Sequence, residues 1–344
     1  MKHLNACINR LISEKTVSSL AIRVGLGDKI LLETCRSSHG DVSASTLFDM
    51  ASVTKIVATT SLTLIAFDRG LLSVDDPISR FFPCPEDKKG LTIQHLLTHT
   101  LGIGHKPLNL PENNYGNIGE KILQIPCDIP VGSDVLYSCP AFILLGKILE
   151  KLYGMPLNKA FLEFVARPLE MNDSSFLPDI SSHSFVNSNM TDDRLAIVND
   201  YNCYFLGGVA GNAGLFSNLN DMTKYVKMLR NYGAPLIQRE TFCAAIANYT
   251  ANLSESRGLG FLFVDARYPQ TGKLFAEGSI GHCGHTGQSV FVDLRTGLYV
   301  ILLSDATRTT IETYGNEDYG LVIQMREDLH NAILADLTDS GLSF

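Results

Sequence analysis

Segments with the pattern of β-strands lie near both ends of the 344-residue chain, and segments with the pattern of helices fill most of the interval between them. The apolar, β-branched runs that predict strands are residues 18–24, 29–33, 258–265, 288–293 and 298–304. Helical periodicity predicts helices over residues 52–68, 92–98, 140–153, 220–232, 240–248 and 320–337. A chain with this order can form a single sheet only if its two ends come together.

This order predicts an α+β fold in which an antiparallel sheet is flanked by helices. The short connection at residues 25–28 is typical of a hairpin, which pairs its strands antiparallel. The sheet lobe would comprise approximately residues 1–50 and 258–344, and a mostly helical second lobe would comprise approximately residues 51–257. The amphipathic segment 320–337 would cover one sheet face. Ligands often bind in the crevice between two lobes, so the residues of a site should come from several segments.

Charge and composition exclude several classes of function. The chain has 28 Lys and Arg against 36 Asp and Glu, a net charge of -8 and no basic run, so we expect no nucleic acid and no membrane as partners. The apolar run 56–67 is too short for a transmembrane helix, and the N-terminus lacks the apolar region of a secretory signal. Eight cysteines without a CxxC pair are typical of reduced thiols. We therefore expect a cytoplasmic protein that acts on a small molecule.

A serine and a lysine lie three residues apart in the apolar run FDMASVTKIVATTS, residues 48–61. On a helix, Ser52 and Lys55 would share one face, with their β-carbons about 5–6 Å apart. Burying the lysine amine costs free energy unless another group compensates it, which is explained if the amine activates the serine as a nucleophile. An S-x-x-K pair also occurs by chance, and the lysine could instead extend to the surface from a core helix.

Four further segments, together with FDMASVTK, resemble in order the signatures of the class C β-lactamase-like serine hydrolases. They are TIQHLLTHTLGI, YSCPAFILLGKILEKLYGMPL, LGGVAGNAGLFSNLNDM and GHCGHTGQSVFVDLRTGLYVILL. This group contains β-lactamases, DD-peptidases, D-aminopeptidases and esterases. The resemblance extends from about residue 17 to about residue 305, and it implies a single β-lactamase/transpeptidase-like catalytic domain over residues 1–344.

The resemblance implies roles for four residues. Ser52 would be the acylated nucleophile, and Lys55 would hold its hydroxyl and accept or relay its proton. Tyr137 would be the base in acylation and the acid for the leaving group, because neighbouring cationic groups are expected to lower its pKa from about 10. Cys139 stands where the family has Asn or Asp. A thiol is a weak hydrogen-bonding group, so its contact with a substrate amide should be weaker than in relatives.

The third motif of the family, Lys-Thr-Gly or His-Thr-Gly, fits this chain in two frames. One frame begins at His282, and the other begins at His285 with a literal HTG. We prefer the first, because related esterase-like sequences have a similar spacing from the motif to the next Asp and turn. In that frame His282 would tune the proton of the tyrosine, and Cys283 and Gly284 would contact the substrate. The backbone N–H groups of Ser52 and His285 would form the oxyanion hole.

Two groups of histidines could be interpreted as metal ligands. His95 and His99 have i, i+4 spacing, and a second group lies between His282 and His285. Neither has the H-E-x-x-H glutamate or a third ligand at a fixed spacing, so we expect no metal. The glycine-rich segment 207–217 lacks the Gly-Lys-Ser/Thr ending of a phosphate loop, so we expect no cofactor, and its glycines should permit close backbone packing.

The sequence therefore predicts a serine hydrolase that acts through an acyl-enzyme on a small ester, amide or β-lactam. A histidine in the third motif is largely neutral at pH 7, which weakens a clamp for a substrate carboxylate. Together with Cys139, this favours a cytoplasmic esterase or amidase over a cell-wall DD-peptidase or an efficient β-lactamase. Two alternatives stay open: a DD- or D-aminopeptidase, and a non-hydrolytic penicillin-binding or sensor protein on the same fold.

Overall fold

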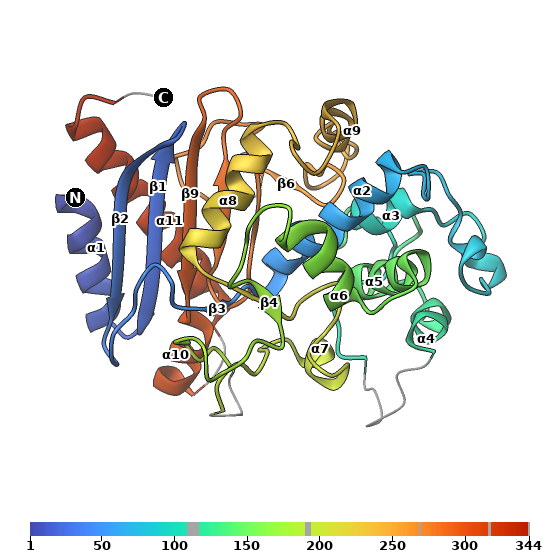
Figure 1. The fold of residues 1–344 in the computed structure, drawn as a ribbon, viewed down its shortest axis with the longest axis horizontal. Coiled ribbons are helices and arrows are strands. Elements are labelled where there is room, and N and C mark those ends of the chain that lie inside the picture. Colours follow the sequence, from blue (N-terminus) through green and yellow to red (C-terminus); the bar gives the residue numbers. More distant parts are fainter. Residues whose placement is uncertain (109–116, 190–193, 268–269, 316–317, 343–344) are drawn as a thin grey trace.

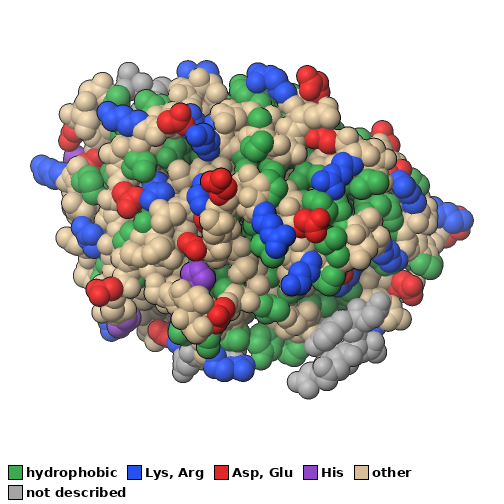
Figure 2. Space-filling model, in the orientation of Figure 1, with side chains coloured by type: hydrophobic (Ala, Val, Ile, Leu, Met, Phe, Trp, Pro, Cys, Tyr) green, Lys and Arg blue, Asp and Glu red, His purple; other side chains and the backbone are tan. Residues whose placement is uncertain are grey.

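A computed structural model of the protein describes residues 1–108, 117–189, 194–267, 270–315 and 318–342. Figure 1 shows a twisted sheet on one side of the molecule and a group of helices on the other. None of the helices in these ranges combines the length and apolar character needed to cross a membrane. On the face in Figure 2, acidic and basic side chains are interspersed, so this face presents both signs of charge.

The larger sheet has six antiparallel strands in the order β2-β1-β9-β8-β7-β6. These strands are β1 (Ser19–Leu26), β2 (Lys29–Ser37), β6 (Leu262–Phe263), β7 (Ile280–Cys283), β8 (Ser289–Val292) and β9 (Leu298–Ser304). A smaller sheet contains β3 (Phe48–Asp49), β4 (Ser175–Phe176) and β5 (Leu215–Ser217). In the larger sheet β1 pairs with β9, with Leu20 opposite Ser304. The two ends of the chain therefore meet in one sheet, which confirms the predicted α+β fold.

Alternating residues of β9 pack into two different cores, because successive side chains of a strand point to opposite faces. The even-numbered residues from Leu298 to Leu302 pack with the terminal helices α1 (Lys2–Ser13) and α11 (Tyr319–Asp339). The odd-numbered residues from Tyr299 to Leu303 belong to the larger core, which also contains the helical side of the molecule. The amphipathic helix near the C-terminus thus covers one sheet face, as the sequence predicts.

The remaining helices lie between the strands of the larger sheet in sequence or follow β9. They are α2 (Ser61–Asp68), α3 (Ile93–Leu97), α4 (Ile118–Gln124), α5 (Cys139–Tyr153), α6 (Leu157–Phe161), α7 (Tyr201–Phe205), α8 (Leu219–Arg230), α9 (Arg239–Ala245) and α10 (Ala306–Tyr314). Short 3-10 turns cover Ala51–Val53, Ile78–Arg80 and Glu86–Lys88, and π-helical turns cover Lys55–Thr60 and Leu162–Ala166. The helix predicted over 52–68 is thus a continuous helical segment that begins with a 3-10 turn, continues as a π-helix and ends as the α-helix α2.

The strand predicted over 258–265 is wrong for most of its length, because only Leu262–Phe263 is a strand. Two glycines interrupt it. Gly260 has a φ of +82°, and a β-carbon there would lie 2.0 Å from the Thr60 hydroxyl oxygen. The backbone at Gly260 therefore turns toward Thr60 and leaves the extended conformation of a strand.

Helix α8 packs on the sheet face opposite α1 and α11, against β1, β8 and β9 (Figure 1). In sequence it lies within the segment that we predict to form the helical lobe. The lobe boundaries near residues 50 and 258 stay a prediction.

Candidate active site

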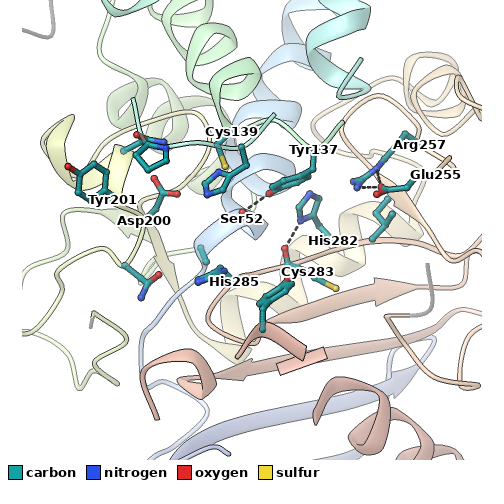
Figure 3. Close-up of a pocket in the computed structure, with 17 residues that line it drawn as sticks. Ser52, Tyr137, Cys139, Asp200, Tyr201, Glu255, Arg257, His282, Cys283 and His285 are labelled. Carbon is teal, nitrogen blue, oxygen red and sulfur yellow. Dashed lines mark hydrogen bonds and ion pairs between the residues drawn. The ribbon is translucent and has the colours of Figure 1, made fainter. Parts of the chain in front are cut away.

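Three predicted catalytic side chains meet at one hydroxyl group. Ser52 lies on the 3-10 turn Ala51–Val53, Lys55 begins the next turn, and Tyr137 lies just before α5. Lys55 Nζ donates to Ser52 Oγ at 2.9 Å, and the Tyr137 hydroxyl donates to the same oxygen at 2.7 Å. Figure 3 marks the bond between Tyr137 and Ser52. The fold therefore brings a lysine and a tyrosine from separate segments to the predicted nucleophile.

Asp49 supports the turn that carries Ser52. Ala51 has a φ of +45°, in the left-handed region that residues other than glycine seldom adopt. Asp49 Oδ1 accepts from the Ala51 N–H at 2.8 Å, and Oδ2 accepts from the Asn199 N–H at 2.7 Å. Burial raises the pKa of Asp49 to about 6, although these two hydrogen bonds oppose the rise. Asp49 thus holds the strained residue that aims Ser52 into the pocket.

Lys55 is fully buried, and its side-chain nitrogen has three hydrogen-bond acceptors. Nζ contacts Ser52 Oγ at 2.9 Å, the Asn212 carbonyl oxygen at 3.0 Å and Cys139 Sγ at 3.4 Å. An ammonium group has three hydrogens to donate, so these contacts offset the cost of its burial. The contact with Ser52 is the one that the S-x-x-K spacing predicts.

Tyr137 donates to Ser52 as a neutral phenol. Burial of the hydroxyl and the nearby Cys139 raise the pKa of Tyr137 well above its usual value, outweighing the Ser52 hydrogen bond and the Arg257 guanidinium, which lower it. The prediction that neighbouring cations lower this pKa is therefore wrong, because burial disfavours the phenolate more than the cations favour it. Beneath the tyrosine lies His99, with the ring centroids 4.6 Å apart.

His95 and His99, the first pair of possible metal ligands, each accept a hydrogen bond from a backbone N–H group. The Thr92 N–H donates to His95 Nδ1 at 3.1 Å, and the Ser138 N–H donates to His99 Nδ1 at 3.0 Å. His99 is fully buried, and burial lowers its pKa well below the usual value. A neutral His99 thus supports the backbone and ring next to the nucleophile.

His282 lies on β7 beside Tyr137, with ring centroids 6.2 Å apart. Burial, together with the charges of Arg257 and Lys55, lowers its pKa well below the usual value. Its Nδ1 donates to the Cys283 carbonyl at 2.7 Å, which leaves Nε2 unprotonated in the neutral ring. This buried Nε2 has no hydrogen-bond partner within the described residues. His282 therefore offers an acceptor, not a cation, to a ligand.

Gly284 and His285 follow β7 and pass close to the chain that leads to the nucleophile. A β-carbon on Gly284 would lie 3.0 Å from the Met50 carbonyl oxygen, so a larger residue would push the two segments apart. The His285 ring stacks on Tyr319, with centroids 5.3 Å apart. His282 and His285 both line the pocket, so both frames of the third motif border it.

The pocket is a cavity of about 550 Å³, and the predicted substrate-contacting residues Cys139 and Cys283 both line it. Cys139 begins α5, and Cys283 ends β7. Gly284 and Lys55 do not belong to its lining. Their position behind the surface means that they act on a ligand through the backbone and through Ser52, respectively.

Arg257 is a pocket residue that the sequence analysis did not identify (Figure 3). It is 3% exposed, and its Nε donates to Glu255 Oε2 at 2.9 Å while Nη2 contacts the same carboxylate. Its Nη1 is buried and has no hydrogen-bond partner within the described residues. The guanidinium lies 5.9 Å from the Tyr137 ring centroid. The pocket thus contains a permanent cation, although the third motif supplies none.

Comparisons with known proteins agree with this geometry. The β-lactamase family model matches residues 4–321. The chain is 27% identical over 312 residues to a protein of Escherichia coli (strain K12) whose name assigns it provisionally to the D-alanyl-D-alanine carboxypeptidases. That match covers 78% of this chain and 71% of the relative.

Two solved structures share the fold. The octameric penicillin-binding protein homologue of Pyrococcus abyssi has a TM-score of 0.73 and 20% identity, and the match covers 98% of this chain and 77% of that one. EstCE1, described as a hydrolase with promiscuous acyltransferase activity, has a TM-score of 0.71 and 18% identity, over 96% and 98% of the two chains. Because the family model spans most of the sequence, this protein belongs to the β-lactamase family.

Proposed function

We propose that this protein is a serine hydrolase of the class C β-lactamase-like type, which transfers an acyl group from a small ester or amide to Ser52 and then to water. The observation that carries the proposal is the Ser52 hydroxyl, which lies between Lys55 Nζ at 2.9 Å and the Tyr137 hydroxyl at 2.7 Å. Both distances are within reach of proton transfer. A serine placed in this way is an activated nucleophile.

The protonation of Tyr137 assigns the base to Lys55. Because the tyrosine is a phenol, it has a proton to give to the leaving group and none to take from Ser52. Lys55 acts as the base once its ammonium group has released one proton to water. The amine then donates its two remaining hydrogens to Asn212 and Cys139 and accepts the Ser52 proton on its lone pair. The proton then passes from Lys55 to Tyr137 as the leaving group departs, which restores both groups.

The tetrahedral oxyanion would bind at the point where β7 approaches the nucleophile. We assign its two donors to the backbone N–H groups of Ser52 and His285, in the frame of the third motif that begins at His282. The close packing of Gly284 against Met50 supports this frame, because it holds the chain before His285 near the turn of Ser52. Removal of one such donor elsewhere costs about 3 kcal/mol of transition-state stabilisation.

The pocket favours an ester or amide that also carries a carboxylate. Arg257 Nη1 is a buried donor without a partner in the described part of the chain, and Glu255 holds the rest of the guanidinium in place. The Nη1 group is left to donate a charge-assisted hydrogen bond to a substrate carboxylate. This cation replaces the one that a lysine in the third motif would give. With Arg257 in this role, the substrates could include those of a DD-carboxypeptidase, the activity in the name of the E. coli relative.

The first test is labelling of Ser52 and turnover of small substrates. We expect a fluorophosphonate to label the wild-type protein at Ser52, and we expect p-nitrophenyl acetate to be hydrolysed with turnover. The Ser52→Ala variant should lose both, with a rate at least about 10³-fold lower, because the covalent intermediate cannot form. Stable labelling of Ser52 by a penicillin, with no turnover of esters or amides, would instead identify a penicillin-binding sensor.

A further inference from the structure

Cys139 belongs to a cluster of reactive groups at the pocket wall. It is the first residue of α5, a helix of 15 residues. Its Sγ accepts a hydrogen bond from Lys55 Nζ at 3.4 Å, and the His105 ring, which also lines the cavity, is hydrogen-bonded to the thiol. The side chain is 2% exposed, so only a small reagent that enters the cavity can reach it.

The surroundings of Cys139 favour its thiolate. Burial raises the pKa of Cys139, but the Lys55 charge and the His105 hydrogen bond lower it, and the net direction is downward. The N-terminus of α5 adds a partial positive charge on the same side. Cys283 lines the same cavity, yet burial raises its pKa. Burial also raises the pKa of Cys203, well above the usual value. Of Cys139, Cys203 and Cys283, only Cys139 has surroundings that lower the thiol pKa.

We propose that Cys139 is a modification site for hydrogen peroxide, and that its oxidation to the sulfenic acid switches the hydrolase off. The thiolate sulfur attacks one peroxide oxygen, the O–O bond breaks, and the departing hydroxide takes a proton to leave as water. Sulfur is oxidised by two electrons and peroxide is reduced by two. The sulfenic acid is restored by two equivalents of a small thiol, which leave as a disulfide together with one water.

Oxidation would disable Lys55, because the two groups are in direct contact. We expect the sulfenic acid oxygen to bond Lys55 Nζ and to compete with Ser52 and Asn212 for its hydrogens. Loss of the Ser52 contact removes the proposed base. The loss of activity rests on the proposed function, whereas the reactivity of the thiol does not.

The reactivity of Cys139 is tested on the Ser52→Ala variant, because this measurement does not require an active enzyme. The protein is treated with hydrogen peroxide in the presence of dimedone, and the labelled cysteines are identified by peptide mass spectrometry over time. We expect Cys139 to be labelled at least about 10-fold faster than Cys283 and Cys203, and faster than the exposed Cys243. Labelling of Cys243 while Cys139 stays unmodified would overturn the proposal.

The loss of hydrolase activity on oxidation is tested on active protein, and the rate of each variant after treatment is compared with its own untreated rate. Peroxide should remove at least about 90% of wild-type activity, and dithiothreitol should restore it. Cys139→Ser should keep its own rate under the same treatment, whereas Cys243→Ser should lose activity as the wild type does. If Cys139→Ser fails to fold, Cys139→Asn replaces it, with a residue type that the family resemblance implies at this position. Loss of activity in the Cys139 variant at the wild-type rate would contradict the switch.

Discussion

Burial determines the role of Tyr137, and charge determines the role of Arg257. The tyrosine keeps its proton because its hydroxyl is enclosed, and the arginine keeps its charge in any environment because of its chemistry. One therefore serves as a proton donor and the other as a fixed positive anchor. These two roles lead to separate predictions, because one concerns the chemical step and the other concerns binding.

Replacement of Tyr137 by phenylalanine should lower kcat by about 10²–10⁴-fold, the usual contribution of a general acid or base. The phenyl ring keeps the contact with His99 but cannot protonate the leaving group. Steady-state kinetics with an amide substrate measure the change. Tyr153→Phe is the matched control, because its hydroxyl bonds the Leu62 carbonyl and Tyr153 does not line the pocket. Equal rates for wild type and Tyr137→Phe would contradict the acid role.

Replacement of Arg257 by methionine should remove the preference for substrates with a carboxylate. We expect KM for such a substrate to rise by about 10–100-fold, the equivalent of a lost hydrogen bond to a charged group of 1.5–3 kcal/mol. KM for the matched uncharged methyl ester should change little. Arg36→Met, on the exposed part of β2, controls for the change in net charge. A rise of equal size for both substrates would indicate a structural role only.

Sequence patterns could identify Ser52, Lys55 and Tyr137, because each lies in a segment whose spacing is constrained by its neighbours. They could not identify Arg257, which lies in an irregular segment and reaches the pocket only through tertiary packing. They also gave the wrong direction for the pKa of Tyr137. A sequence contains the nearby charges but not the extent to which a hydroxyl is enclosed.

Among the elements, the segment 207–217 and α5 approach unusually closely. A β-carbon on Gly211 would lie 2.0 Å from the Phe142 carbonyl oxygen and 3.0 Å from the Gly146 Cα. The next residue, Asn212, gives its carbonyl to Lys55. The predicted role in close packing is therefore confirmed for Gly211, and this packing positions a contact of the proposed base.

Gly211→Ala should lower both stability and activity. The methyl group must push the loop away from α5, which we expect to cost about 1–3 kcal/mol of unfolding free energy. It should also reduce kcat, because Asn212 moves away from Lys55. Urea unfolding and steady-state kinetics measure the two effects. Gly90→Ala is the control, because a β-carbon there meets nothing within 4 Å. A Gly211→Ala protein as stable as wild type would contradict this packing.

Periodicity was a good guide to long elements and a poor guide to short ones. It predicted α5, α8, β9 and α11 to within about two residues, because their buried positions recur regularly. It did not predict α1, although the buried residues Leu4, Ile8 and Leu11 have helical spacing. Polar and charged residues lie between these three, which obscures the apolar face of the helix in the sequence.

In the molecule as a whole, three buried histidines are held neutral: His99, His282 and His330. Each has a folded-state pKa below that of the unfolded chain. As the pH falls below about 6.5, the unfolded state takes up protons that the folded state refuses, so stability is lost towards acid. Low pH should therefore destabilise both the pocket, through His99 and His282, and the packing of α11 on the sheet, through His330.

His330 of α11 gives this effect a magnitude, because burial lowers its pKa to about 4 from 6.5. Between pH 7.5 and pH 4.5 this residue alone should remove about 2–3 kcal/mol of unfolding free energy. The His330→Gln variant should lose that much less than wild type over the same range. Denaturant unfolding at several pH values measures the difference, and His39→Gln, on the exposed surface, is the control. Parallel curves for wild type and His330→Gln would contradict the assignment.

The pairing of β1 with β9 has a consequence for synthesis on the ribosome. Residues 20–26 pair with residues 298–304, so the hairpin of β1 and β2 is made long before its neighbouring strand β9. Meanwhile its unpaired edge is exposed to other nascent chains, and the helices in between can compact earlier because their contacts are local. The larger sheet can therefore be completed only after residue 304 has been made.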